Sequence, residues 1–174
     1  MRSYLIVLVS FLLTVTSCKK EKKESNVSLQ KNVMNVVAKH TPFSKLDASS
    51  LKKIKKWKEY FIIEDFIHQF EKTSATDALN NAIELKTLTK HLKDSLNIET
   101  LKTPAFRARL NVFENEVLRL TDMTYIPSIT SNQVNSQVAK TLNLFGSMND
   151  KINTVYAKIR FDKDIKLDSL FTIE

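Results

Sequence analysis

Glycine is almost absent from this chain: Gly146 is the only one among 174 residues, and there are only three prolines. Tight turns and β-hairpins depend on such residues to reach their backbone angles. Helices joined by short polar loops need few of them. With 43% apolar residues, the chain also has enough material for a core. The composition therefore predicts an all-α fold.

Apolar residues recur at helical spacing in several segments. The first segment covers residues 49–72, and Ser74 or Thr76 caps the second, which ends near residue 96. Thr103 and Pro104 predict the start of the third, because threonine caps helices and proline suits the first helical position. The buried positions of this third segment are expected to be Phe106, Leu110, Phe113, Val117 and Leu120.

The last segment opens at residues 128–131 and has the most regular pattern. Its apolar positions alternate at spacings of four and three: Val134, Val138, Thr141, Phe145, Met148, Ile152, Val155 and Ile159. Such a seven-residue repeat packs helices at shallow, left-handed angles. Gly146, beside the core position Phe145, is expected to let a neighbouring segment approach closely, at a cost of about 1 kcal/mol in helix propensity.

Together these segments predict an antiparallel up-down four-helix bundle with coiled-coil-like packing over residues 49–160. Residues 18–48 precede it as a tether and linker, with residues 26–48 docking in part on the body. Val33, Met34, Val36 and Val37 are compatible with one or two short helical turns there. Residues 161–174 are expected to form a tail, either folded back or extended.

Residues 1–17 have the layout of a secretory signal peptide. Arg2 supplies a positive start, residues 5–15 form an apolar run interrupted only by Ser10 and Thr14, and small or branched residues follow. A membrane-spanning helix needs about 20 apolar residues, so this run is too short to span. The sequence therefore predicts export.

The residues that end this segment, Val15-Thr16-Ser17-Cys18, resemble the lipobox of bacterial lipoproteins. The resemblance implies a diacylglycerol group on the Cys18 sulfur, cleavage before Cys18 and further acylation of the new amino terminus. Cys18 is the only cysteine of the chain, so a disulfide within the chain is excluded. Two or three acyl chains anchor a protein stably. We expect a lipid-anchored protein of the cell envelope.

Charged residues follow the cysteine directly, and residues 19–24 are all lysine or glutamate. Such a segment buries no apolar area and is expected to be a solvated tether. Lys20-Glu21 resembles the start of the signal by which some bacteria sort lipoproteins to the outer face of the outer membrane, but Lys22 stands where a second acid is usual. The outer membrane is the expected location, with the periplasmic and surface-exposed faces both open.

The body resembles a group of uncharacterised helical-bundle lipoproteins from outer-membrane bacteria, some labelled "viral A-type inclusion protein". The start at residues 103–106 and the long last helix carry this resemblance. The group implies no activity.

Motifs for catalysis or cofactor binding are incomplete. Residues 65–68, Asp-Phe-Ile-His, are related to the Glu-x-x-His motif of di-iron bundles, but His91 and Asp94 occur in the reverse order. Haem attachment through Cys-x-x-Cys-His is excluded, and Met148 on the apolar register is expected to fill the core. Phosphate-binding loops and the strained turns that carry a nucleophilic serine need several glycines, so the single glycine of the chain excludes both. We expect no metal, no cofactor and no enzymatic activity.

The net charge of +8 is concentrated in the first third of the chain, and residues 51–58 are its densest part. On a helix, Leu51, Ile54 and Phe61 share one face and Trp57 lies at its border. The remaining faces carry four lysines: Lys52, Lys53, Lys55 and Lys56. This pattern fits a solvated face of a bundle helix. It also fits a surface that binds anionic lipid or lipopolysaccharide head groups, or an acidic envelope protein.

A basic patch could also bind nucleic acid, but the predicted export to the cell envelope argues against that partner. The sequence thus predicts a lipid-anchored interaction or scaffold protein of the cell envelope. The alternative is a bundle that binds a ligand or metal, as sensor-type bundles do.

Overall fold

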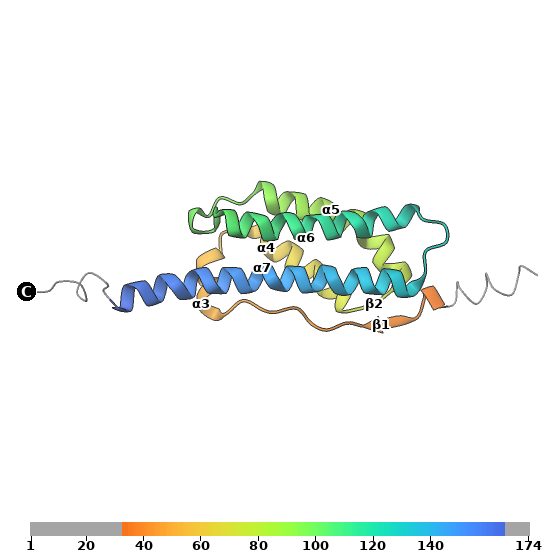
Figure 1. The fold of residues 1–174 in the computed structure, drawn as a ribbon, viewed down its shortest axis with the longest axis horizontal. Coiled ribbons are helices and arrows are strands. Elements are labelled where there is room, and N and C mark those ends of the chain that lie inside the picture. Colours follow the sequence, from red (N-terminus) through yellow and green to blue (C-terminus); the bar gives the residue numbers. More distant parts are fainter. Residues whose placement is uncertain (1–32, 166–174) are drawn as a thin grey trace, which may run out of the picture. The chain divides into compact units, whose positions relative to one another are not determined.

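A computed structural model describes residues 33–165 of the chain, and most of them are helical. The helices are α3 (Ala48–Ile54), α4 (Lys58–His68), α5 (Ala75–Asp94), α6 (Pro104–Asp122) and α7 (Ser131–Ile165). Short 3₁₀ turns cover Gln69–Glu71, Glu99–Leu101 and Met123–Tyr125. Figure 1 shows α5, α6 and α7 running beside one another, with α4 visible between α6 and α7. The mainly helical fold class is confirmed, but two short strands, β1 (Val37–Lys39) and β2 (Lys72–Ser74), were not predicted.

Local capping signals set the starts of two helices where the sequence predicts them. The Ser74 hydroxyl accepts a hydrogen bond from the Asp77 backbone N–H at 3.1 Å, at the start of α5. At the start of α6, the Thr103 hydroxyl accepts from the Phe106 N–H at 3.2 Å, and Pro104 is the first helical residue. Each side chain satisfies a backbone donor that a helix end leaves free.

The apolar positions predicted for α6 and α7 form the core. All five predicted α6 positions are buried, as are the α7 positions from Val134 to Ile152. Val155 and Ile159 are partly buried against the same core. The α7 helix continues to Ile165, five residues beyond its predicted end.

The prediction of one continuous helix over residues 49–72 is wrong. The chain leaves the helix after Ile54, turns at Lys55 and Lys56, and re-enters helix at Lys58. Trp57 causes the break, because its indole Nε1–H donates to the Ser95 hydroxyl at 2.9 Å and its ring packs on Phe106. Only 1% of Trp57 is exposed, so it is a core residue and not the border residue that the helical pattern indicates.

The end of the same segment lies close to its predicted position near residue 72, but an unpredicted strand, β2, begins there. After α4 the chain makes a 3₁₀ turn and becomes extended at Lys72–Ser74, where it pairs antiparallel with β1. Val37 lies opposite Ser74, and Lys39 lies opposite Lys72. Val37 is therefore in a strand rather than in a helical turn. The paired residues of β1 and β2 lie more than 30 positions apart in the sequence.

Residues 37–47, which we name the strap, run from β1 along α7 to the start of α3 (Figure 1). Two strap side chains, Phe43 and Leu46, are buried. The Phe43 ring packs edge-on against Phe145 at 5.0 Å and lies 4.6 Å from the His68 ring. The strap is thus an integral part of the core packing over its second half.

Asparagine side chains of α7 hold the strap backbone. Asn149 donates to the Ser44 carbonyl at 2.8 Å, and Asn153 donates to the Lys45 carbonyl at 3.0 Å. The Asn153 side-chain oxygen accepts from the Asp47 N–H at 3.0 Å. A Cβ added at Gly146 would lie 2.9 Å from the Ser44 backbone nitrogen. The close approach predicted at Gly146 is confirmed, and the neighbour is the strap.

Candidate functional site

The candidate binding surface is the basic turn, which we define as the lysines around the α3–α4 junction. Lys52 and Lys53 lie in the last turn of α3, and Lys55 and Lys56 lie in the turn itself. Lys58, the first residue of α4, completes the set. All five side chains are exposed. The four predicted lysines therefore lie together, but on a turn between two helices and not along one helical face.

These lysines form no ion pair with the part of the chain that the structure describes. Within residues 33–165, none of the five ammonium groups lies within 4.0 Å of a carboxylate. Nearby parts of the body do pair their charges, as Lys93 does with Glu114 at 2.6 Å and Lys102 with Glu99 at 2.5 Å. The basic turn thus presents concentrated positive charge that the described fold does not neutralise.

Buried aromatic residues hold the basic turn in place. The Trp57 N–H donates to the Ile54 carbonyl at 2.7 Å, which closes the turn over Lys55 and Lys56. The Trp57 ring lies 5.7 Å from Tyr60 and 6.2 Å from Phe106. Packed aromatic pairs of this kind resist displacement. The lysines accordingly extend from a fixed backbone.

Tyr60 connects this aromatic cluster to the strap. Its hydroxyl lies 3.0 Å from both the Glu64 and the Asn149 side-chain oxygens. Burial is the main cause that raises the pKa of the Tyr60 phenol, and Glu64 raises it further. The phenol therefore stays protonated and acts as a hydrogen-bond donor. Sequence reasoning missed this role of Asn149, because the partner lies 89 residues away.

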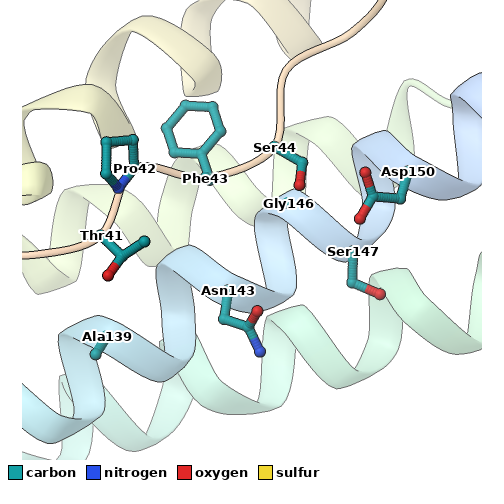
Figure 2. A pocket seen from close by; sticks show the side chains of 9 residues that line it. All are labelled: Thr41, Pro42, Phe43, Ser44, Ala139, Asn143, Gly146, Ser147 and Asp150. Carbon is teal, nitrogen blue, oxygen red and sulfur yellow. The ribbon is translucent and has the colours of Figure 1, made fainter.

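A polar groove of about 460 Å³ lies where the strap crosses α7. Figure 2 shows Thr41, Pro42 and Ser44 on the strap above Asn143, Ser147 and Asp150 of α7. The lining includes one carboxylate and no histidine, cysteine or basic side chain. It offers hydrogen-bond donors and acceptors but lacks a nucleophile paired with a base.

The residues considered for metal or haem binding are dispersed or used in packing. Asp65 is exposed, whereas the His68 ring contacts Phe43 and its Nδ1 lies 3.3 Å from Glu71. Met148 is fully buried in the core. Among residues 33–165, no three histidine, cysteine, aspartate or glutamate side chains gather as metal ligands would.

Cys18, the predicted lipidation site, lies outside the described residues. In the part of the chain that is described, no helix is both long enough and apolar enough to cross a membrane. Compared with protein-family models, with curated proteins and with solved structures, the chain has no match in any of the three comparisons.

Proposed function

We propose that the chain is a non-enzymatic, lipid-anchored interaction protein of the bacterial outer membrane, attached through Cys18. In this proposal α4 to α7 act as an antiparallel up-down four-helix bundle. The basic turn of that bundle binds an acidic surface of another envelope protein. The lipobox resemblance of Val15-Thr16-Ser17-Cys18 supports the anchor.

The observation that carries the proposed binding activity is the concentration of five exposed lysines around one turn, none of which has a carboxylate partner among residues 33–165. A surface charge pair adds little to stability, with a median of about 0–1 kcal/mol. Charges of one sign instead steer association with an oppositely charged partner. The lysines are therefore better explained by recognition than by folding.

The described body begins far from the basic turn, and we propose a protein partner for this turn rather than the membrane that would hold the anchor. Trp57 contacts Ser95 at the end of α5, whereas β1 pairs with β2, which directly precedes α5. The 20 residues of α5 separate these two places by about 30 Å at 1.5 Å per residue. The chain thus enters the body at the end that lies far from the lysines.

Contacts between successive helices support the bundle arrangement. The Thr121 hydroxyl of α6 donates to the Ala82 carbonyl of α5 at 3.2 Å. The Gln137 side chain of α7 donates to the Glu116 carbonyl of α6 at 2.8 Å. Near the other end of α7, the Tyr156 hydroxyl lies 3.1 Å from the Thr100 hydroxyl, just before α6. Between α6 and α7, the contacting residues have falling numbers on one helix as the numbers rise on the other. Antiparallel neighbours have this pattern.

Crosslinking in living cells followed by mass spectrometry tests the proposal. A variant with Lys52, Lys53, Lys55 and Lys56 changed to glutamine should lose its specific protein crosslinks. A matched variant changes four other exposed lysines to glutamine and so removes the same charge elsewhere: Lys86, Lys90, Lys140 and Lys163. This second variant should keep the crosslinks. Equal crosslinking by both variants and the unchanged chain would contradict the proposed role of the basic turn.

Two further measurements separate the parts of the proposal. Intact mass of the purified protein should show acyl chains on Cys18, and Cys18→Ser should release the protein from the membrane fraction. If the basic turn instead binds lipid head groups, the two four-lysine variants should differ in salt-sensitive binding to anionic vesicles. That result would replace the protein partner with a lipid surface.

A further inference from the structure

The end of the body at which the chain enters carries an unusual share of exposed apolar side chains, and we name it the apolar end. Tyr125 is 75% exposed and Val36 is 62% exposed. Within residues 33–165, nine large hydrophobic side chains are exposed, and the apolar end includes five of them: Val33, Val36, Val37, Tyr125 and Ile126. Single exposed hydrophobic residues are ordinary, but a gathering of them marks an interaction site.

Two segments that are distant in sequence supply these side chains, and α5 holds both. The Thr76 hydroxyl donates to the Met34 carbonyl at 3.2 Å and lies 2.6 Å from the Asn35 side-chain oxygen. Six residues further along α5, the Ala82 carbonyl accepts from Thr121, which lies two residues before the 3₁₀ turn Met123–Tyr125. In Figure 1 β1 and the loop between α6 and α7 lie at the same end of α7.

A pair of lysines lies beside this apolar surface. Lys39 of β1 is directly opposite Lys72 of β2, and both are exposed. Neither has a carboxylate within 4.0 Å among the described residues. Like charges directly across a strand pair are destabilising. Because residues two apart in a strand share a face, Val37 and Lys39 are presented together. This face combines apolar contact with attraction for anions.

The proposed anchor is closer in sequence to this end than to the basic turn. Cys18 precedes Val33 by 15 positions, and a chain of that length reaches at most about 50 Å even when fully extended. The strap then carries the chain away from the apolar end toward α3. Of the two ends of α5, the apolar end is therefore the one nearest in sequence to the acyl chains.

We propose that the apolar end lies on the surface of the membrane that holds the anchor. Its aliphatic side chains and the Tyr125 ring contact the boundary between head groups and acyl chains, where amphipathic rings and exposed aliphatic groups are favoured. Lys39 and Lys72 contact anionic head groups. The basic turn then faces away from this membrane. This inference rests on the lipid anchor of the proposed function.

Environment-sensitive fluorescent labels on the acylated protein in vesicles of phosphatidylethanolamine and phosphatidylglycerol test this orientation. A label on Ile126→Cys should shift to the blue and should be quenched by lipids brominated in their acyl chains. A label on Val112→Cys is the matched control, because Val112 of α6 is 45% exposed and Ile126 is 46% exposed. The label on Val112→Cys, and a label on Lys55→Cys in the basic turn, should keep the emission of a dye in water and should not be quenched by the brominated lipids.

The outcomes distinguish the inference from the anchor. If the protein is acylated and bound but the Ile126 and Val112 labels respond alike, the orientation is overturned and the anchor stands. If Cys18 carries no acyl chain, the proposed anchor is wrong. The same labels on a Cys18→Ser chain then show whether the apolar end contacts the membrane. In that chain Tyr125→Ser with Ile126→Ser should weaken vesicle binding by about tenfold, the effect of removing some 1.4 kcal/mol of apolar burial. Binding that stays unchanged would also overturn the inference.

Discussion

The basic turn and the apolar end differ in how their surfaces relate to the core. At the basic turn, Ile54 and Trp57 are fully buried and every lysine between or beside them is exposed. At the apolar end, Val36 and Tyr125 are exposed although the core accepts neighbouring residues such as Met34. Folding accounts for the first arrangement and not for the second. The proposed contact of the apolar end with a membrane surface would account for this difference.

The two places also differ in what holds them. A cluster of aromatic rings fixes the basic turn. In contrast, β1 pairs with β2 at three residue positions, and Thr76 contacts the residues just before β1. An isolated two-stranded pair has little stability of its own. We therefore expect the basic turn to lose its structure only with the core, and the apolar end to open more readily. Of the four substitutions below, the first tests what holds the basic turn, and the other three test the strap that leads from the apolar end to α3.

Removal of the Trp57 ring should have the largest effect. Trp57→Ala should lower the free energy of unfolding by about 3–5 kcal/mol, because it leaves a cavity between Tyr60 and Phe106. Urea denaturation followed by circular dichroism measures the loss. Trp57→Phe should cost less, because it keeps part of the ring packing and removes the bond to Ser95. A loss below about 1 kcal/mol for the alanine variant would show that the core does not hold the basic turn.

The break at Trp57 also shows where sequence reasoning reaches its limit. Ile54 and Trp57 are three positions apart, so they share one face of an uninterrupted helix. Residues 55 and 56 are lysines, and neither is a glycine or a proline that would announce a turn. The decisive contact is made with Ser95, which lies 38 positions away. A periodic pattern records which residues are buried but not whether the backbone between them is continuous.

Where a helix start or a buried stripe depends on residues that are close in the sequence, the sequence is sufficient to predict it. Thr103 and Pro104 set the start of α6, and the regular repeat of α7 gives its buried stripe. The exposed lysines could likewise be read from composition, although their place on a turn could not. For residues 26–48 the sequence predicts only that they dock in part on the body. The contact of the strap with Asn149 and the pairing of β1 with β2 escape prediction, because these partners are distant in sequence.

Loss of the Asn149 amide should release the middle of the strap. Asn149→Ala removes the donor to Ser44 and the acceptor for Tyr60, and we expect a loss of about 1–3 kcal/mol. Hydrogen exchange should rise at residues 43–47 before it rises in the basic turn. Asn143→Ala on the same helix is the control, because Asn143 is exposed and should stay within about 0.5 kcal/mol. Equal effects of both substitutions would contradict the role of Asn149.

A methyl group at Gly146 should have a smaller effect of the same kind. Gly146→Ala gains about 1 kcal/mol of helix propensity but places Cβ against the Ser44 backbone, and such overpacking costs about 1–3 kcal/mol. We expect a net loss of about 1 kcal/mol in thermal or urea unfolding. Ser147→Ala, one position along α7, should be neutral or slightly stabilising. Stabilisation by both would mean that the strap moves away without cost.

The smallest effect concerns the link between the strap and α3, where Asp47 caps the helix. The Ser49 hydroxyl donates to the Asp47 carboxylate, and with the Ser50 N–H and Arg160 it lowers the pKa of Asp47 from 3.8 to about 2. A lowered pKa stabilises the fold above the ordinary value, and that contribution is lost as pH falls from about 4 to about 2. Asp47→Asn keeps a capping side chain but does not titrate.

The unchanged chain should therefore lose slightly more stability than Asp47→Asn between these pH values, while the two should converge near pH 2. Parallel urea titrations at several pH values measure the difference, and the other acidic groups cancel because both proteins contain them. The exposed position of Asp47 keeps the effect small, since solvent screens its charge. If the variant is less stable than the unchanged chain by the same amount at every pH, Asp47 acts through the shape of its side chain. Its charge would then contribute nothing where the strap joins α3.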